Sequence, residues 1–458
     1  MRMRGLVGVL LLLAATGAFA SGTQVYEQGS KASALAGAFV AQADDPSAVF
    51  YNPAGMAFQK GMNLSFNLTY IRADVKHLSP TYGTFQNNAK NFFLPSFFFT
   101  MPINDKITFG LSNTAPFNLA TDWADDFNGR FAGRHSKIVT FQVRPAVSFK
   151  LDDHNAVAIG LDYYDSEINL IRSANTSAIS TAINPHRLPS PPFPPGIPFY
   201  RFSEVSLDTH VRDQALGWNV SYMGQWDHLS LGLFYHSKAK FDYDGHVSFE
   251  VPASLRSVSY LFPGQGVNLS LTSVPASARL GLGYKWDKWR AEVDLNWTQW
   301  STWGTAPAHF QKPTSFHGSP VVANETFVFN WKDGYTYRVG ASYQYSDHYT
   351  INFGALYDET AIGNNERSPL LPDQARWAFT FGTSYKKGHW GLDWYAMYLK
   401  WNNAHVTEYN HYRSDSTGLP LVVVPVYGQL YPTSYDIVPD GKYKGQAYLY
   451  GVSLSYRF

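Results

Sequence analysis

The last stretch of the chain alternates strictly between two kinds of side chain. Counting back from Phe458, every second residue is large and apolar or aromatic: Tyr456, Leu454, Val452, Tyr450 and Tyr448. The residues between them are Arg457, Ser455, Ser453, Gly451 and Leu449. Side chains of a β-strand point to opposite faces with a period of two. This stretch is therefore predicted to be a strand with lipid on one face and a polar or packed interior on the other.

The same alternation recurs along the chain, as in residues 139–144, 289–297 and 376–381. One alternating strand does not separate a membrane barrel from a soluble sandwich, because both have one apolar face. The number of strands and the lengths of their connections decide between them. We expect fourteen strands: 61–75, 91–101, 106–118, 136–151, 155–172, 207–226, 229–246, 267–285, 289–299, 326–345, 348–358, 374–386, 389–401 and 443–458.

The connections between these strands alternate between short and long. The short ones are 102–105, 152–154, 227–228, 286–288, 346–347 and 387–388. Short turns at one rim, long loops at the other and both termini on the short-turn side are typical of a bacterial outer-membrane barrel. We therefore expect an all-β fold, a 14-stranded antiparallel transmembrane β-barrel over residues 61–458, with both termini in the periplasm of a Gram-negative bacterium.

Composition agrees with an exported membrane protein. Charged residues make up 16% of the chain, below the roughly 25% of soluble domains. Residues 1–20 combine Arg2 and Arg4, a short apolar run and an Ala-x-Ala ending, which predicts a secretory signal peptide. Removing Arg2 and Arg4 from the 36 basic residues leaves 34 against 35 acidic ones, so no nucleic-acid partner is expected. The chain has no cysteine and hence no disulfide.

Residues 21–60 are rich in small residues and precede every predicted strand. A stretch such as 29–37 has no periodic apolar face and suits a confined space between other walls. Fourteen strands enclose a lumen wide enough to hold water or a plug. We therefore expect residues 21–60 to form a plug, or hatch, inside the barrel. Its marker residues are Asp44, Asp45, Asn52, Pro53 and Ala54, with a turn at Pro53. The alternative is an ordinary turn before the first strand.

Several blocks of sequence share their spacing with a known family. They are 43–45 with 52–54, 102–105, 119–123, 331–335 with Arg338, and 372–376. Over essentially its whole mature length, the chain resembles the long-chain fatty acid transporters of the outer membrane, the FadL family. This resemblance implies a barrel occluded by an N-terminal hatch that carries the Asn52-Pro53-Ala54 turn. It also implies passive uptake of hydrophobic molecules through a gap in the barrel wall.

The expected exit for such cargo is in the strand 106–118, at Asn113, Thr114, Ala115 and Pro116. Proline removes a donor from the strand ladder and belongs at an edge or a bulge. The resemblance implies that this third strand is kinked so that the wall opens sideways. A proline that merely lies near the rim is the alternative.

The expected landing site for cargo is in the long connections. Prolines in 189–198 form a stiff scaffold that would hold Phe193, Phe199 and Tyr200 outward, with Phe262 from the connector 247–266 nearby. A structureless spacer is the alternative.

The charge of the cargo is left open by the sequence. Where relatives that carry fatty acids can have a basic group, this chain has Phe327 and Phe329, and Arg172 is the candidate partner for a carboxylate. The cargo is therefore a fatty acid or a neutral hydrocarbon.

Charged residues on the expected inner face form a third group of interest. We expect them to pair with one another and with Asp44 and Asp45, because an unpaired charge inside a plugged barrel is costly. They are Arg144, Asp162, Arg279, Arg290, Glu292, Asp294, Arg338 and Arg376.

Two other functions compete with transport of hydrophobic molecules. The sequence has no Gly-x-Ser-x-Gly or His-Glu-x-x-His motif, so an outer-membrane enzyme is not expected, nor is a cofactor or metal. A water-filled porin is the other alternative, and the expected hatch argues against it. The expected partners are a hydrophobic small molecule, outer-membrane lipid and lipopolysaccharide. The barrel assembly machinery is a further expected partner, because it reads a C-terminal aromatic residue such as Phe458.

Overall fold

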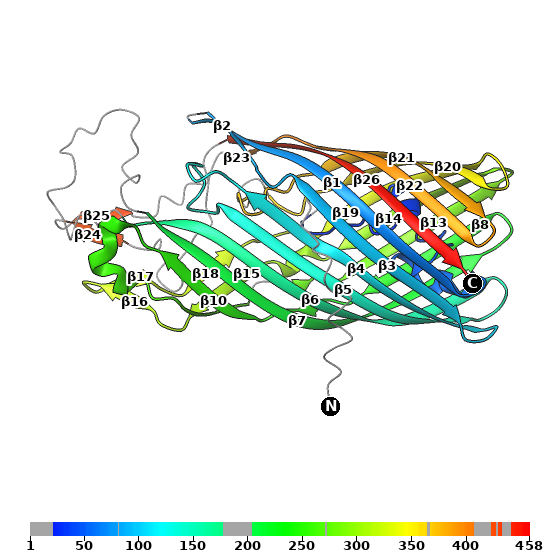
Figure 1. Cartoon of the computed structure of the whole chain (residues 1–458), viewed down its shortest axis with the longest axis horizontal. Coiled ribbons are helices and arrows are strands. Elements are labelled where there is room, and N and C mark those ends of the chain that lie inside the picture. The colour runs from blue at the N-terminus through cyan, green and yellow to red at the C-terminus, as the bar shows by residue number, and fades with distance from the viewer. Residues whose placement is uncertain are drawn as a thin grey trace.

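The computed structural model describes residues 22–80, 82–176, 204–270, 273–363, 367–406, 423–426, 429–432 and 441–458. The predicted signal peptide therefore lies outside the described residues. Fourteen long strands form a closed antiparallel barrel, which confirms the predicted fold class (Figure 1). In order around the wall, they are β1 (Asn63–Ser79), β3 (Asn91–Pro102), β4 (Ile107–Asp122), β5 (His135–Lys150), β6 (Asn155–Asn175), β7 (Glu204–Gln225), β8 (Leu229–His236), β13 (Ser277–Trp286), β14 (Trp289–Thr298), β19 (Gly334–Gln344), β20 (Tyr349–Asp358), β21 (Arg376–Lys387), β22 (Trp390–Trp401) and β26 (Gly441–Arg457).

The barrel closes because β26 pairs with β1 along nearly its whole length, from Lys442↔Leu78 to Arg457↔Asn63. Along β26 the residues predicted to face lipid are exposed, with Val452 at 50% and Leu454 at 49%, whereas Gly451 and Ser453 are buried. The exposure of the side chains along this strand therefore alternates with the predicted period of two. Among the helices of the described residues, none has the length and apolarity to cross a bilayer.

Three of the predicted strands are split, because the barrel carries a second tier of short strands at its long-loop rim. The predicted strand 229–246 ends as β8 at His236, and the chain resumes as β10, which pairs with the far end of β7. The predicted strands 267–285 and 326–345 divide in the same way (Figure 1). The remaining strands are β2 (Gly83–Gln86), β9 (Ala239–Lys240), β10 (Tyr243–Glu250), β11 (Gln265–Leu269), β12 (Ser273–Val274), β15 (Thr305–Phe310), β16 (Thr314–Phe316), β17 (Ser319–Val322), β18 (Glu325–Val328), β23 (Ala404–Val406), β24 (Val423–Val426) and β25 (Gln429–Pro432).

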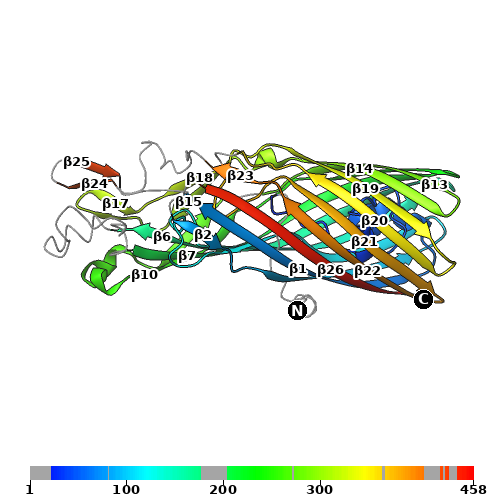
Figure 2. The same cartoon turned by 90° about the horizontal axis from the view of Figure 1, so that it is seen from above.

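Residues 22–60, here called the N-terminal segment, lie inside the barrel (Figures 1 and 2). The segment holds the short helices α1 (Ser30–Ala34), α2 (Ala48–Tyr51) and η2 (Pro53–Phe58). Nearly all of its side chains up to Met56 are buried. Two further short helices, η5 (Ala253–Leu261) and η6 (Trp300–Thr302), belong to the connections.

The N-terminal segment lies directly against the wall where the wall has no side chains. A Cβ atom added to Gly340 of β19 would be 2.9 Å from the Cβ of Leu35, and one added to Gly354 of β20 would be 2.5 Å from the amide nitrogen of Ala36. These positions tolerate only glycine, because any larger residue would overlap the segment. The inner wall therefore has a flat surface shaped to receive this part of the chain.

Replacing Gly340 by valine should displace the N-terminal segment and leave the barrel closed. The added side chain would overpack the contact with Leu35, at a cost of about 1–3 kcal/mol, whereas the β19 ladder needs no change. We expect steady single-channel conductance in planar bilayers, which the wild-type protein should lack. Gly304→Val is the control, because nothing lies within 4 Å of a Cβ there. A Gly340→Val protein that shows no steady conductance, like the control, would contradict this prediction.

Deleting Phe458 should reduce the amount of barrel in the outer membrane without changing export across the inner membrane. Phe458 is 60% exposed, and its ring packs against the Tyr456 ring with the two centroids 4.8 Å apart. Its loss should therefore affect recognition by the assembly machinery more than barrel stability. Quantitative blotting of membrane fractions measures the effect, and Phe458→Tyr, which keeps an aromatic terminus, should behave as wild type. Equal outer-membrane levels after the deletion would refute this role.

Candidate functional site

The turn predicted at Asn52 and Pro53 attaches the N-terminal segment to strand β7. The Asn52 side-chain amide donates to the Val40 carbonyl at 2.7 Å and to the Tyr222 carbonyl of β7 at 3.1 Å. The Ala54 amide donates to the Asn52 side chain at 3.1 Å and to the Ser221 hydroxyl at 3.0 Å. Pro53 is the first residue of η2, where its missing N–H leaves no unsatisfied donor. One turn thus joins two parts of the segment to the wall.

Asp44 and Asp45 form their polar contacts within the N-terminal segment. Asp44 pairs with Lys31 at 2.6 Å, and Asp45 accepts from the Ser47 amide at 2.8 Å. Burial raises the pKa of Asp44, but the combined attraction of Lys31, Lys386 and Arg290 outweighs burial, so that its pKa lies below the usual value. The prediction that these carboxylates pair with the inward arginines of the wall is therefore wrong.

The inward arginines of the wall instead donate to backbone carbonyls of the N-terminal segment. Arg338 reaches the Ala36 carbonyl at 2.6 Å, and Arg290 reaches the Ala41 carbonyl at 2.8 Å. The segment is buried and irregular, so its backbone groups need partners other than a regular helix or sheet. The predicted pairing within the wall does occur elsewhere, as in Arg144–Asp162 at 2.5 Å and Arg376–Asp358 at 2.6 Å.

Two inward carboxylates of β14 bind the backbone amides of the same part of the segment. Asp294 accepts from the amides of Phe39 at 2.9 Å and Val40 at 3.1 Å. Glu292 accepts from the Ala41 amide at 2.6 Å. Both side chains are buried, and each accepts these main-chain hydrogen bonds through one of its two oxygens, Asp294 Oδ2 and Glu292 Oε1. The charges of the inner wall thus position the main chain of the segment.

The wall is interrupted where the lateral opening was predicted. β3 pairs with β4 only from Phe97↔Asn113 to Pro102↔Thr108, whereas residues 91–96 of β3 pair with β1 alone. On the other side of β4, the register with β5 shifts between Thr114 and Phe117. Ala115 and Pro116 therefore form a bulge that has lost β3 as its partner.

The N-terminal segment takes the place of β3 at this bulge. The side-chain oxygen of Gln28 accepts from the Ala115 amide at 3.2 Å and the Ser96 hydroxyl at 2.8 Å. The side-chain nitrogen of Gln28 donates to the Ala115 carbonyl at 3.0 Å, and the Val25 amide donates to the Pro116 carbonyl at 2.7 Å. Gln28 was missed by the sequence analysis, because a single glutamine among small residues has no periodicity that would mark it.

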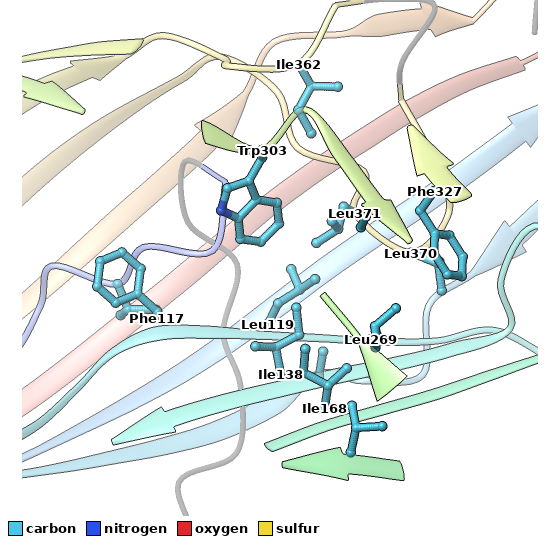
Figure 3. Packing of buried hydrophobic residues seen from close by; sticks show 14 of the residues in the cluster. Phe117, Leu119, Ile138, Ile168, Leu269, Trp303, Phe327, Ile362, Leu370 and Leu371 are labelled. Carbon is cyan, nitrogen blue, oxygen red and sulfur yellow. The ribbon is translucent and has the colours of Figure 1, made fainter. Parts of the chain in front are cut away.

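Above the bulge, apolar side chains line the interior of the barrel and of its second tier. Phe117 follows Pro116 directly, and its ring centroid lies 6.5 Å from that of Trp300. Trp303 and Trp331 stack with their centroids 4.4 Å apart. This lining runs from the interrupted wall towards the long loops. Figure 3 shows part of it, with side chains from several strands and loops: Phe117, Leu119, Ile138, Ile168, Leu269, Trp303, Phe327, Ile362, Leu370 and Leu371.

Arg172 lies in this apolar lining, but a carboxylate accompanies it. Its guanidinium forms an ion pair with Glu325 of β18 and lies 5.5 Å from the centroid of the Phe327 ring. Arg172, Glu325 and Phe327 line a small cavity of about 20 Å³ together with Leu269 and other apolar residues. The structure thus brings the predicted Arg172 and Phe327 together and adds Glu325, which the sequence analysis did not select.

The remaining predicted cargo residues are separated from this cavity. Phe329 packs edge-on against Trp303, with centroids 5.6 Å apart. Phe262 is buried against Phe249 in the second tier, with centroids 6.0 Å apart. The other three predicted landing residues lie outside the described residues: Phe193, Phe199 and Tyr200.

Known proteins are similar in sequence to most or nearly all of this chain. A long-chain fatty acid transport protein of Salmonella typhi is 25% identical over 401 residues, which is 83% of this chain and 87% of that protein. Outer membrane protein P1 of Haemophilus influenzae is 24% identical over 487 residues, 99% of both chains.

Solved structures share the fold. A FadL homologue of Pseudomonas aeruginosa superposes with a TM-score of 0.76 at 20% identity, covering 95% of this chain and all of that one. The toluene transporter TodX of P. putida gives a TM-score of 0.69 at 13% identity, covering 94% and 98% of the two chains. The model of the outer membrane protein transport family (OMPP1/FadL/TodX) matches residues 11–458. The chain is therefore an outer-membrane β-barrel that belongs to the OMPP1/FadL/TodX family of transport proteins.

Proposed function

We propose that the protein takes up hydrophobic molecules passively and releases them sideways into the membrane through the interruption between β3 and β4. The observation that carries this proposal is the position of the bulge. The apolar lining of the interior reaches Phe117, and Ala115 and Pro116 beside it have no β3 partner. An apolar molecule that follows the lining thus arrives where β3 and β4 are not hydrogen-bonded to each other.

The physical reason for a lateral exit is the free energy of exposing a hydrocarbon to water. Each exposed methylene costs about 0.8 kcal/mol, so a ten-carbon chain would face roughly 8 kcal/mol on an axial path into the periplasm. A lateral exit keeps the molecule in contact with apolar groups throughout. The long-loop rim would face outward and the termini the periplasm, so cargo would land near Phe262 and the predicted Phe193, Phe199 and Tyr200.

In this mechanism the N-terminal segment acts as the hatch. Gln28 occupies the place of β3 at the bulge, so it must release Ala115 before cargo can pass. The turn at Asn52, Pro53 and Ala54 would stay attached to β7 and keep the segment inside the barrel. Small movements of the first residues of the segment would then open the exit.

Neutral molecules suit the interior better than carboxylates. Arg172 is the cation closest to the apolar cavity described above, and Glu325 neutralises it. A fatty-acid carboxylate would have to compete with Glu325 for this arginine. We therefore favour neutral hydrocarbons or esters over fatty acids as cargo.

Closing the interruption should slow uptake and leave binding intact. In the double variant Ala115→Val with Pro116→Val, position 116 regains an N–H group and both positions gain strand-forming side chains. We expect uptake of a long-chain hydrophobic fluorescent probe to fall about tenfold, the effect of roughly 1.4 kcal/mol on the barrier. Equilibrium binding to the purified barrel should change little.

Pro145→Val in β5 is the control, since it alters a wall proline away from the exit. If uptake survives in a variant whose structure shows a closed wall, the cargo travels axially and the lateral route is wrong.

Removing the charge of Glu325 should shift the preference towards fatty acids. Glu325→Gln keeps the size of the side chain and raises the net charge of the cavity by one unit, which favours a carboxylate. The ratio of fatty-acid affinity to affinity for the matched hydrocarbon should rise about fivefold, equivalent to roughly 1 kcal/mol. Competition binding with the two ligands measures this ratio. An unchanged ratio would show that cargo does not approach Arg172.

A further inference from the structure

Basic side chains gather on the outer face of the wall near the long-loop rim. They come from adjacent strands, β22, β26 and β1, and from the residue that precedes β3. β1 and β26 lie side by side in both views of the barrel (Figures 1 and 2). We call this group the basic patch: Arg72, Lys76, Lys90, Lys400, Lys442 and Lys444.

Strand pairing places these cations next to one another. Lys76 of β1 is directly opposite Lys444 of β26, and Lys400 of β22 is opposite Gln446, on the same face and next along from Lys444. Lys442, Lys444 and Lys400 are exposed on the outer face, whereas the residues next to them along each strand point inward and are buried. Like charges directly opposite one another destabilise a sheet. Their clustering here is therefore unfavourable unless an anion binds.

The residues that the structure describes supply little negative charge to the patch. Asp74 approaches Lys76 at 3.7 Å and also accepts a hydrogen bond from Gln86. In the described part of the chain, no ion pair with a carboxylate engages the other five cations of the patch. Both Lys76 and Asp74 are also partly exposed, at 43% and 39% of their side chains, so even this pair is weak.

The outer face of the opposite side of the barrel has the reverse charge. On β6, β7 and β10 it carries Asp165, Glu167, Asp208 and Asp244, with Arg212 held by Asp165 at 2.5 Å. The outer face of the wall is therefore positive at β22, β26 and β1 and negative at β6, β7 and β10.

The patch lies at the height where lipid head groups meet the hydrocarbon layer. Level with Arg72 is the exposed Tyr448, and below both is Tyr450; exposed tyrosines of this kind are typical of a membrane interface. From Tyr448 to Lys444 the strand rises about 13 Å at roughly 3.3 Å per residue, before the tilt is considered. A hollow of about 680 Å³ on this face is lined by three tyrosines and by Arg72, Lys76 and Lys90, with Asp74 and two glutamines among them.

We propose that the basic patch binds the phosphate groups of lipid A, the anchor of lipopolysaccharide. The tyrosines below would contact its acyl chains, and the lysines above would bind its two phosphates as charge-assisted partners. The inference uses the proposed function only for the outward orientation of the long-loop rim. It needs neither cargo nor lateral exit, so its test is independent of uptake.

The test compares lipid A binding to the purified barrel in detergent, counted by native mass spectrometry and titrated in mixed micelles. The variant carries Lys76→Gln, Lys442→Gln and Lys444→Gln. The matched control carries Lys285→Gln, Lys288→Gln and Lys387→Gln, three exposed lysines at the short-turn rim. We expect roughly 100-fold weaker binding for the patch variant, because each cation near an anionic lipid surface contributes a factor of about five. The control should bind as wild type. Heat-modifiable mobility on gels verifies that each barrel is folded.

The chemistry of the ligand gives a second readout that uses only the wild-type protein, in case the triple variant fails to fold. Bisphosphorylated lipid A should bind far more tightly than the same lipid with both phosphates removed, and millimolar inorganic phosphate should compete poorly because it lacks acyl chains. Equal affinity for the two lipids would overturn the proposal, as would equal loss in patch and control variants. Full competition by inorganic phosphate would reduce the patch to a simple anion site and would also overturn it.

Discussion

Backbone N–H and C=O groups inside a hydrocarbon layer have no water to bond, so every strand of a membrane barrel needs a partner on both sides. This wall meets that requirement by continuous strand pairing from β8 to β26 and back to β1. Where β3 and β4 are not paired, Gln28 and Val25 of the N-terminal segment form the hydrogen bonds to the backbone of Ala115 and Pro116. The interruption is thus stable only while the segment is in place. The same few hydrogen bonds thus complete the pairing of the wall and hold the segment against it.

The same requirement explains the charges inside the barrel. An irregular, buried segment has amides and carbonyls that no regular structure satisfies. The wall supplies carboxylates for the amides near Phe39 and guanidinium groups for the carbonyls of Ala36 and Ala41. Charged side chains of the lumen that look unmatched from the sequence therefore find main-chain partners in the docked segment.

The sequence predicted the strands of the wall well, because side chains in every strand of a membrane barrel alternate between the lipid-facing and the inward-facing side. The alternation along residues 448–458 requires only a period of two and does not depend on distant partners. The second tier was not predicted, because a strand that leaves the barrel wall and pairs with β7 keeps its alternation and gives no local sign of the break. Pro116 was a usable signal, since proline has a direct effect on the ladder. Gln28 and Glu325 were not, because their roles arise from neighbours 87 and 153 residues away.

The contacts that hold the N-terminal segment against the wall involve mainly its backbone. Arg290, Glu292, Asp294 and Arg338 bind carbonyls and amides, and Gly340 and Gly354 leave room for the chain itself. Recognition of main-chain groups does not depend on side-chain identity, so the hydrogen bonds at Ala36 and Ala41 fix the path of the chain, whereas Gln28 and Asn52 dock through their side chains. The interior of this barrel is in effect a receptor for a peptide of a given shape. A plug supplied as a separate synthetic chain, with altered side chains at its tip, would then give the barrel a different gate without any change to its wall.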